Sequence, residues 1–206
     1  SRAMWNRLST PWLDRLRAAG VEPEEVDFVL CTHLHTDHVG WNTRLSNGRW
    51  VPTFPNAKYL FSKTDYDYWG EKNREAPALD NAYNDSVLPV VEAGQAVMID
   101  GGHAIDDRFL IEPAPGHTPG HVTMRLTSQG ESALFTGDIM HPPLQVFEPH
   151  WNSHFCEWPA EAAKTRQRVL ESLADTPTLM LPAHFAAPHC GHVHRDGDGF
   201  RFAFAD

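Results

Sequence analysis

The amino-acid sequence predicts a single α/β domain in which helices lie outside a sheet. The chain has 206 residues, of which 41% are hydrophobic. The expected elements run from helix and strand, through several strands, to helix and strand again. This length suits one domain with a sizeable core, and the composition is ordinary for a globular protein. Because we see no repeat, low-complexity segment or linker, we expect residues 1–206 to form one domain.

The expected elements follow from apolar periodicity and turn residues. Residues 11–19 show an amphipathic helical pattern, with Thr10 as N-cap, Pro11 at the first helical position and Gly20 as the stop. Residues 26–32 (VDFVLCT) form a compact apolar run, typical of a buried parallel strand. The other expected elements are strands at 57–62, 96–100, 108–113, 121–127, 132–136, 178–181 and in the segment 196–204, with turns at 101–102 and 129–131, and helices at 64–72, 78–90 and 160–174.

Charge and composition exclude several classes of partner. The net charge of −10, with histidines neutral, argues against a nucleic-acid backbone or an anionic membrane as partner. No apolar run approaches the roughly 20 residues that span a bilayer, and residues 1–8 lack the pattern of a signal peptide. Three cysteines without a CxxC pair indicate reduced thiols. We therefore expect a cytoplasmic protein that acts on a small-molecule substrate.

The most informative pattern is an H-x-H-x-D-H string directly after the apolar run at 26–32. Thirteen histidines occur in the chain, and three of them fall in this string. Alternate residues of an extended segment point the same way, so His33 and His35 can chelate one ion. Asp37 and His38 follow where the chain turns and can face a second ion. The alternative, a solvated polar loop, is a poor explanation for four such ligands within six residues.

Three further candidate ligands stand at the ends of expected strands. His117 lies in a Pro- and Gly-fixed segment, PGHTPGH at 115–121, in which His121 is expected to support or to pack. Asp138 follows the apolar FTG of 135–137, and His184 follows the short strand at 178–181. Each would be weak evidence by itself, and Asp138 alone would be read as a turn residue.

Together the seven residues make a complete set for two divalent ions. His33, His35 and His117 would hold one ion, Asp37, His38 and His184 the other, and Asp138 with a water would bridge them. Three imidazoles with an open position are typical of a catalytic zinc site. Zinc suits these ligands best, and iron, manganese, cobalt or nickel would also fit. The tail residues His189, Cys190, His192 and His194 are interpreted as structural.

These motifs, in this order from residue 26 to 184, resemble the metallo-β-lactamase superfamily. The resemblance implies an αββα sandwich of two similar halves, whose first half normally contributes several strands before the H-x-H-x-D-H string. Only 32 residues precede His33, so we expect much of the N-terminal sheet to be missing from this chain, which would then be N-terminally incomplete. The apolar surface that this would expose favours a homodimer.

Within the family, Asp138 points to the wider hydrolase branch, because zinc β-lactamases usually have Cys or Ser there. The strings at 32–40 (THLHTDHVG) and 118–121 (TPGH) are similar to those of quorum-quenching lactonases and methyl-parathion-type hydrolases. In those lactonases a Tyr stands three residues after the bridging Asp and polarises the lactone carbonyl. Here that position is His141, which would have to take over the donor role.

The resemblance implies a hydrolase in which a metal-bridging hydroxide attacks a lactone or ester carbonyl, with an N-acyl homoserine lactone as one such substrate. Asp37 would carry the proton to the leaving group, and His141 would be the second catalytic side chain. An organophosphate or aryl-ester hydrolase is the alternative enzyme, and a non-catalytic metal-binding subunit the alternative outside enzymes. The aromatic segment with Trp151, His154 and Phe155 would line a substrate pocket or pack on itself.

Overall fold

The computed structural model describes residues 10–76 and 82–205, and the chain divides into two compact units, Ser1–Ile99 and Asp100–Asp206. The sequence expectations for residues 1–8 and for 78–81 lie outside the described residues. The first unit contains α1 (Trp12–Ala18), η2 (Pro23–Glu25), β1 (Phe28–Leu30), α2 (Thr36–Val39), η3 (Gly40–Asn42), β2 (Thr43–Ser46), β3 (Arg49–Pro52), β4 (Lys58–Ser62), α3 (Lys63–Glu75), the π-helical η4 (Tyr83–Val87), α4 (Leu88–Glu92) and β5 (Ala96–Ile99).

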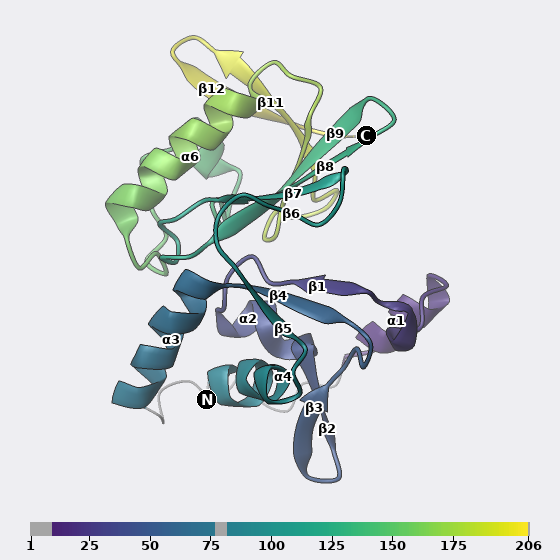
Figure 1. The fold of residues 1–206 in the computed structure, drawn as a ribbon. Coiled ribbons are helices and arrows are strands. Elements are labelled where there is room, and N and C mark those ends of the chain that lie inside the picture. The colour runs from purple at the N-terminus through teal and green to yellow at the C-terminus, as the bar shows by residue number, and fades with distance from the viewer. Residues whose placement is uncertain (1–9, 77–81, 206) are drawn as a thin grey trace. The chain divides into compact units, whose positions relative to one another are not determined.

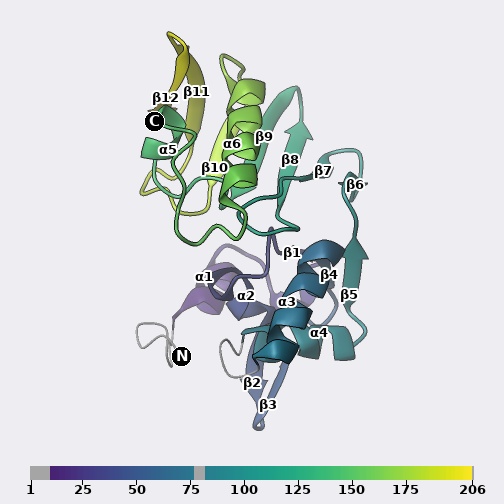
Figure 2. The same ribbon diagram turned by 90° about the vertical axis from the view of Figure 1, so that its left-hand side faces the viewer.

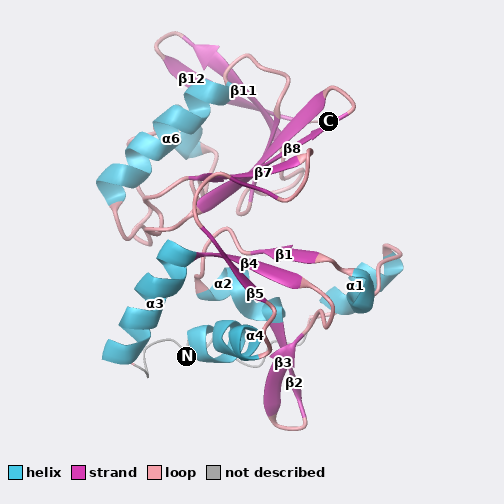
Figure 3. Ribbon diagram, in the orientation of Figure 1, coloured by secondary structure: helices cyan, strands magenta, loops and turns pink. Residues whose placement is uncertain are grey.

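The first unit is built on a parallel sheet with the order β1-β4-β5, beside a separate β2–β3 hairpin. The central strand β4 is buried after its first residue, with Tyr59 and Phe61 at 0% exposure. Val39 of α2 and Val90 of α4 pack into the same apolar cluster as these two rings. Helices therefore cover the sheet, and Figures 1 and 3 show α2, α3 and α4 on the same side of it.

The second unit is built on one seven-stranded sheet. Its elements are β6 (His103–Ala104), β7 (Phe109–Pro113), β8 (Val122–Ser128), β9 (Glu131–Gly137), α5 (Leu144–Phe147), α6 (Pro159–Leu173), β10 (Leu179–Pro182), β11 (Gly191–Asp196) and β12 (Gly199–Phe204). The strand order is β12-β11-β10-β9-β8-β7-β6, and every neighbouring pair is antiparallel except β9 with β10.

Helix α6 covers one face of this sheet (Figure 2). Its apolar stripe includes Val169, Leu170 and Leu173, spaced as one face of an α-helix requires. These side chains share a core cluster with Leu134 of β9 and Met180 of β10. Because β9 and β10 are parallel, α6 serves as the crossover between them, and both strands end at the same edge.

Most expected elements are confirmed, and the differences have local causes. Helix α1 is capped by Pro11 rather than Thr10, without a side-chain hydrogen bond, and Gly20 with φ +86° follows it. The helix expected at 78–90 is, over its described part, the π-helical η4 followed by α4, which extends to Glu92. The β2–β3 hairpin was not predicted, although its Asn47–Gly48 turn has the positive φ angles of a type I′ turn. The short elements α2, α5 and β6 and the strand β11 were also not predicted.

No helix within residues 10–76 and 82–205 is long and apolar enough to cross a bilayer. The three cysteines, Cys31, Cys156 and Cys190, are free thiols.

Candidate metal centre

The first unit presents the H-x-H-x-D-H string between β1 and α2. His33 Nε2 and His35 Nδ1 lie 3.1 Å apart, so the two ring nitrogens converge as the sequence predicted. Two nitrogen ligands of one tetrahedral zinc ion, each bonded at about 2.0–2.1 Å, are separated by about 3.3 Å. The second ring nitrogen of His33, Nδ1, lies 3.1 Å from Thr32 Oγ1. That contact leaves Nε2 as the nitrogen for a ligand.

A buried carboxylate holds the backbone of this string. Asp65, at 0% exposure in the first turn of α3, accepts a hydrogen bond at 3.1 Å from the backbone N–H of Leu34, between the two histidines. Ser62 caps α3 by accepting from the Asp65 N–H. The Trp69 ring, one turn further along α3, makes an edge contact with His35. Asp65 was not predicted as a site residue, and a carboxylate in the first turn of a helix is usually explained by the helix dipole alone.

Asp37 and His38 lie in the short helix α2, which begins directly after His35. The His38 ring packs 4.1 Å from the His33 ring, and its Nε2 lies 3.6 Å from Asp37 Oδ2. All four expected ligands of this unit are therefore neighbours. Cys31, two residues before His33, has its sulfur 3.4 Å from Asn42 Oδ1, and burial raises the pKa of its thiol to about 12.

The second unit gathers its candidate ligands where β9 and β10 end. Gly137 of β9 is paired with Pro182 of β10. Asp138 and His184 follow these residues, and His184 Nε2 lies 3.0 Å from Asp138 Oδ2. Strand β8 runs antiparallel to β9, so the loop before β8, which carries His117, reaches the same edge.

Three imidazoles surround one oxygen of Asp138. The Oδ2 atom lies 3.0 Å from His184 Nε2, 3.3 Å from His141 Nε2 and 3.5 Å from His117 Nε2. Ligand atoms of His117, Asp138 and His141 all lie within 4.8 Å of one another. These separations match those between ligands of one ion, about 3.3 Å. Asp138 itself is 2% exposed, and a buried carboxylate requires such partners.

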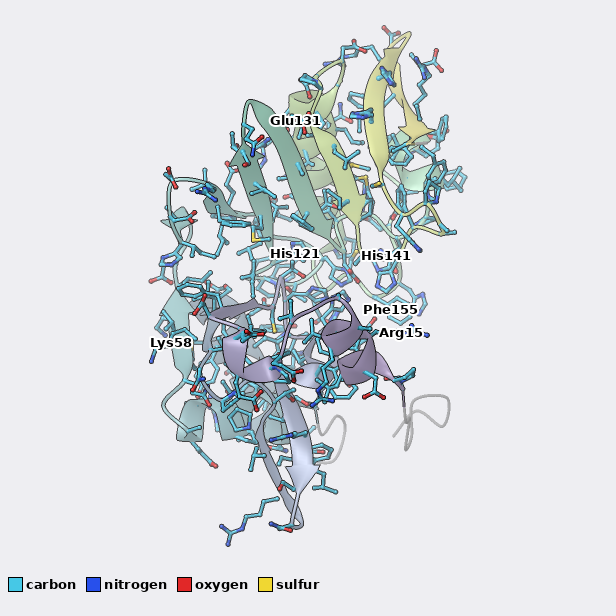
Figure 4. All side chains as sticks on the ribbon, turned by 90° about the vertical axis from the view of Figure 1, so that its right-hand side faces the viewer. Arg15, Lys58, His121, Glu131, His141 and Phe155 are labelled. Carbon is cyan, nitrogen blue, oxygen red and sulfur yellow. The ribbon has the colours of Figure 1, made fainter. Side chains whose placement is uncertain are left out.

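His121 binds the backbone of Asp138, which is the supporting role that the sequence offered as one of two alternatives. The backbone N–H of Asp138 donates to His121 Nε2 at 3.1 Å, so this nitrogen acts as an acceptor. Figure 4 shows His121 and His141 at the same end of the seven-stranded sheet, with Glu131, the first residue of β9, at the opposite end.

The N-terminal half of α6 and the two residues before it hold the loop that carries His117. Thr165 donates to the Pro115 carbonyl at 2.7 Å, and the N–H groups of Glu157 and Trp158 donate to the carbonyls of His117 and Gly116. Gly116 has φ +133°, and an added Cβ would lie 2.2 Å from the backbone nitrogen of Ala162. The close approach of loop and helix therefore requires glycine here.

The other residues singled out in the sequence have local partners, and the Phe155 ring also stacks on the His141 ring. His189 Nδ1 bonds the Phe185 carbonyl, and His194 lies 3.6 Å from Asp175 Oδ1, so both have structural partners. In the aromatic segment, Trp151 and Phe155 remain 52% and 40% exposed, and the His154 and Phe155 rings pack at 3.8 Å. The segment therefore packs in part on itself, which is one of the two alternatives that the sequence offered.

Comparison with known proteins decides the family. The model of the metallo-beta-lactamase superfamily matches residues 3–184. The chain belongs to the metallo-β-lactamase superfamily. This match includes all seven expected ligands and confirms the family and fold predicted from the motifs.

Solved metallo-β-lactamase structures resemble this chain closely. The hydrolase AbOPH, in the beta lactamase superfamily, has a TM-score of 0.85 and 26% identity, covering 99% of this chain and 72% of its own. AidC, a dizinc quorum-quenching lactonase, has a TM-score of 0.81, covering 98% and 71%; at 23% identity this likeness shows the fold alone.

Curated relatives of this metallo-β-lactamase chain include lactonases. The N-acyl homoserine lactonase of Bacillus thuringiensis is 26% identical over 127 residues, which is 61% of this chain and 43% of that protein. AttM of Rhizobium radiobacter, also named an N-acyl homoserine lactonase, is 27% identical over 127 residues, or 54% and 40%. The aligned part thus spans less than half the length of these relatives.

We predict that Gly116→Ala destabilises the protein by about 2–4 kcal/mol, because the positive φ and the contact with Ala162 act together. Urea unfolding measures the change. Gly130→Ala is the matched control, since Gly130 has φ +84° but nothing within 4 Å of an added Cβ, so strain alone should cost about 1 kcal/mol. Equal losses in the two variants would mean that the approach of α6 is not what requires Gly116.

Proposed function

We propose that this protein is a dinuclear metal-dependent hydrolase of lactones or esters. The observation that carries the proposal is the set of three imidazole nitrogens around Asp138 Oδ2 at the end of β9. A buried carboxylate that faces three nitrogens is suited to a cation rather than to apolar contacts. Membership of the metallo-β-lactamase superfamily, over residues 3–184, gives independent support.

In this proposal the seven ligands expected from the sequence would hold two ions. His33, His35 and His117 would hold one ion, Asp37, His38 and His184 would hold the second, and Asp138 would contribute to both. Neutral imidazoles and carboxylates suit zinc best, while iron, manganese, cobalt and nickel remain alternatives for measurement. When bound, two such ions supply a hydroxide at neutral pH and positive charge for the developing oxyanion.

The protein's own side chains then have distinct tasks. Asp37 receives the proton and delivers it to the leaving oxygen, which general acid catalysis requires. His141 Nε2 points toward Asp138 and donates a hydrogen bond to the substrate carbonyl, in the position where related lactonases have Tyr. His121 fixes the Asp138 backbone, and Thr32 fixes the ring of His33.

The substrate class that we propose is a lactone, with N-acyl homoserine lactones as the first candidates. Support comes from the curated relatives that carry this name. The second candidate, an organophosphate or aryl-ester hydrolase, is favoured by His141 itself, which replaces the lactonases' Tyr. A homodimer stays a prediction, which light scattering tests.

Purified protein should contain about two divalent ions per chain, and a chelator should abolish turnover of an acyl homoserine lactone, an aryl ester or a phosphotriester. Plasma mass spectrometry counts the ions, and initial rates choose among the substrates. His35→Ala and His117→Ala should each lower the metal content, whereas His192→Ala, on β11, should not. Fewer than one ion per chain, with no turnover after adding zinc or manganese, would favour the non-catalytic alternative.

Asp37→Asn should lower kcat by roughly 10²–10⁴ in samples loaded with metal to the wild-type content, because the amide cannot carry a proton. Steady-state kinetics on the preferred substrate, with metal analysis of the same sample, measures this. Asp67→Asn, an exposed carboxylate of α3 paired with Lys63, is the matched control. Full turnover in metal-loaded Asp37→Asn protein would exclude the proton-transfer role.

His141→Phe should lower kcat by roughly 10²–10³, the usual loss when one donor to an oxyanion is removed. His141→Tyr restores a donor and should recover part of the loss, more for lactones than for phosphotriesters. The comparison of kcat for the two variants on both substrates is the measurement. If Phe and Tyr reduce turnover equally, hydrogen-bond donation is not what His141 contributes.

A further inference from the structure

The segment 139–152, which carries His141, has little regular structure of its own. It follows Asp138 directly and contains α5 as its one helical turn among the described elements. A catalytic donor on an irregular segment needs other side chains to hold its position within a fraction of an ångström. Two buried side chains, Arg166 and Gln145, supply hydrogen bonds to the backbone of this segment.

Arg166 of α6 joins the two ends of the segment. It is 0% exposed, and its Nε donates to the Ile139 carbonyl at 2.7 Å. Its Nη1 donates to the carbonyl of Pro149 and, at 3.0 Å, to that of Trp151. Burial lowers the pKa of this guanidinium. Burying a cation costs desolvation free energy. Here the hydrogen bonds from the guanidinium to carbonyls of one loop offset that cost and stabilise the conformation of the loop.

Gln145 joins the middle of the segment to its far end. Its side chain is buried, with Oε1 accepting from the backbone N–H of His141 at 2.7 Å. Its Nε2 donates to the Trp151 carbonyl at 2.8 Å, the same oxygen that Arg166 binds. The backbone of His141 is thereby tied, through Trp151, to helix α6.

We propose that Gln145 and Arg166 are positioning residues that fix His141 with its Nε2 toward Asp138. Both side chains act through the backbone of the segment rather than on a substrate. Without Gln145, the hydrogen bond from the His141 N–H and one hydrogen bond to the Trp151 carbonyl are lost. The imidazole can then leave the position in which its Nε2 lies 3.3 Å from Asp138 Oδ2. The kinetic consequence rests on the proposed hydrolase function, whereas the geometric consequence does not.

The kinetic test uses Gln145→Met and Arg166→Lys. Each should lower kcat on the order of tenfold or more with a smaller change in KM, and leave the metal content unchanged. The matched controls are Gln167→Met, whose side chain bonds Glu171, and Arg168→Lys, which is exposed on α6. Both controls should retain wild-type kcat.

A double-mutant cycle separates positioning from general loss of structure. In a His141→Phe background, Gln145→Met should cause little further loss of kcat, because the donor that it positions is already absent. Losses that multiply in the double variant would overturn the proposal, as would an unchanged kcat in Gln145→Met. Arg166→Lys replaces a fully buried guanidinium with an ammonium of different shape and fewer donors. If Arg166→Lys does not fold, Gln145→Met carries the test.

A spectroscopic measurement stands apart from turnover. In metal-loaded protein with ¹⁵N-labelled histidine, the ring signals of His141 are identified by their loss in His141→Phe. We expect Gln145→Met to shift or broaden these signals and to leave those of His192 unchanged. Unmoved His141 signals would overturn the positioning role. If the wild-type protein hydrolyses none of the three substrates, the proposed function fails, while this spectrum still decides whether Gln145 positions His141.

Discussion

The candidate site depends on one buried carboxylate at the end of a strand. Asp138 is 2% exposed, and a charge in that position is stable only when several groups of suitable polarity surround it. Its Oδ2 has three imidazole nitrogens within 3.5 Å, and its backbone N–H donates to a fourth histidine, His121. The arrangement of the second unit around the ends of β9 and β10 brings these groups together.

The backbone around this carboxylate is held by helix α6 on two sides. Its N-terminal half binds the loop of His117 through Thr165 and lies against Gly116. Its buried Arg166 binds the segment of His141. The same helix also fills the core with Leu170 and Leu173, so packing and ligand geometry depend on one element. In the first unit, α3 has the corresponding task, because Asp65 binds the backbone between His33 and His35.

Much of the fold and of the candidate site could be predicted from local pattern. The apolar strands, helix α6 and the Gly-Pro-rich loop at 115–121 have periodicity or turn chemistry that neighbouring residues reveal. The spacing of the histidines in the H-x-H-x-D-H string is enough to identify them as candidate ligands. The β2–β3 hairpin was missed although Asn47–Gly48 carries its signal, because the flanking strands, Thr43–Ser46 and Arg49–Pro52, are short and largely exposed.

The sequence by itself determined the family and the candidate ligands, since a possible metal ligand is recognised by its donor atom and its place at a strand end. Only the tertiary structure decided what holds the backbone around the candidate site residues. Asp65, Gln145 and Arg166 act through hydrogen bonds to backbone groups that are 31, 4 and 27 residues away along the chain. Backbone groups are the same at every position, so no sequence pattern marks such a partner. The packing of α3 and α6, which follows from burial of apolar surface, brings donors and acceptors together.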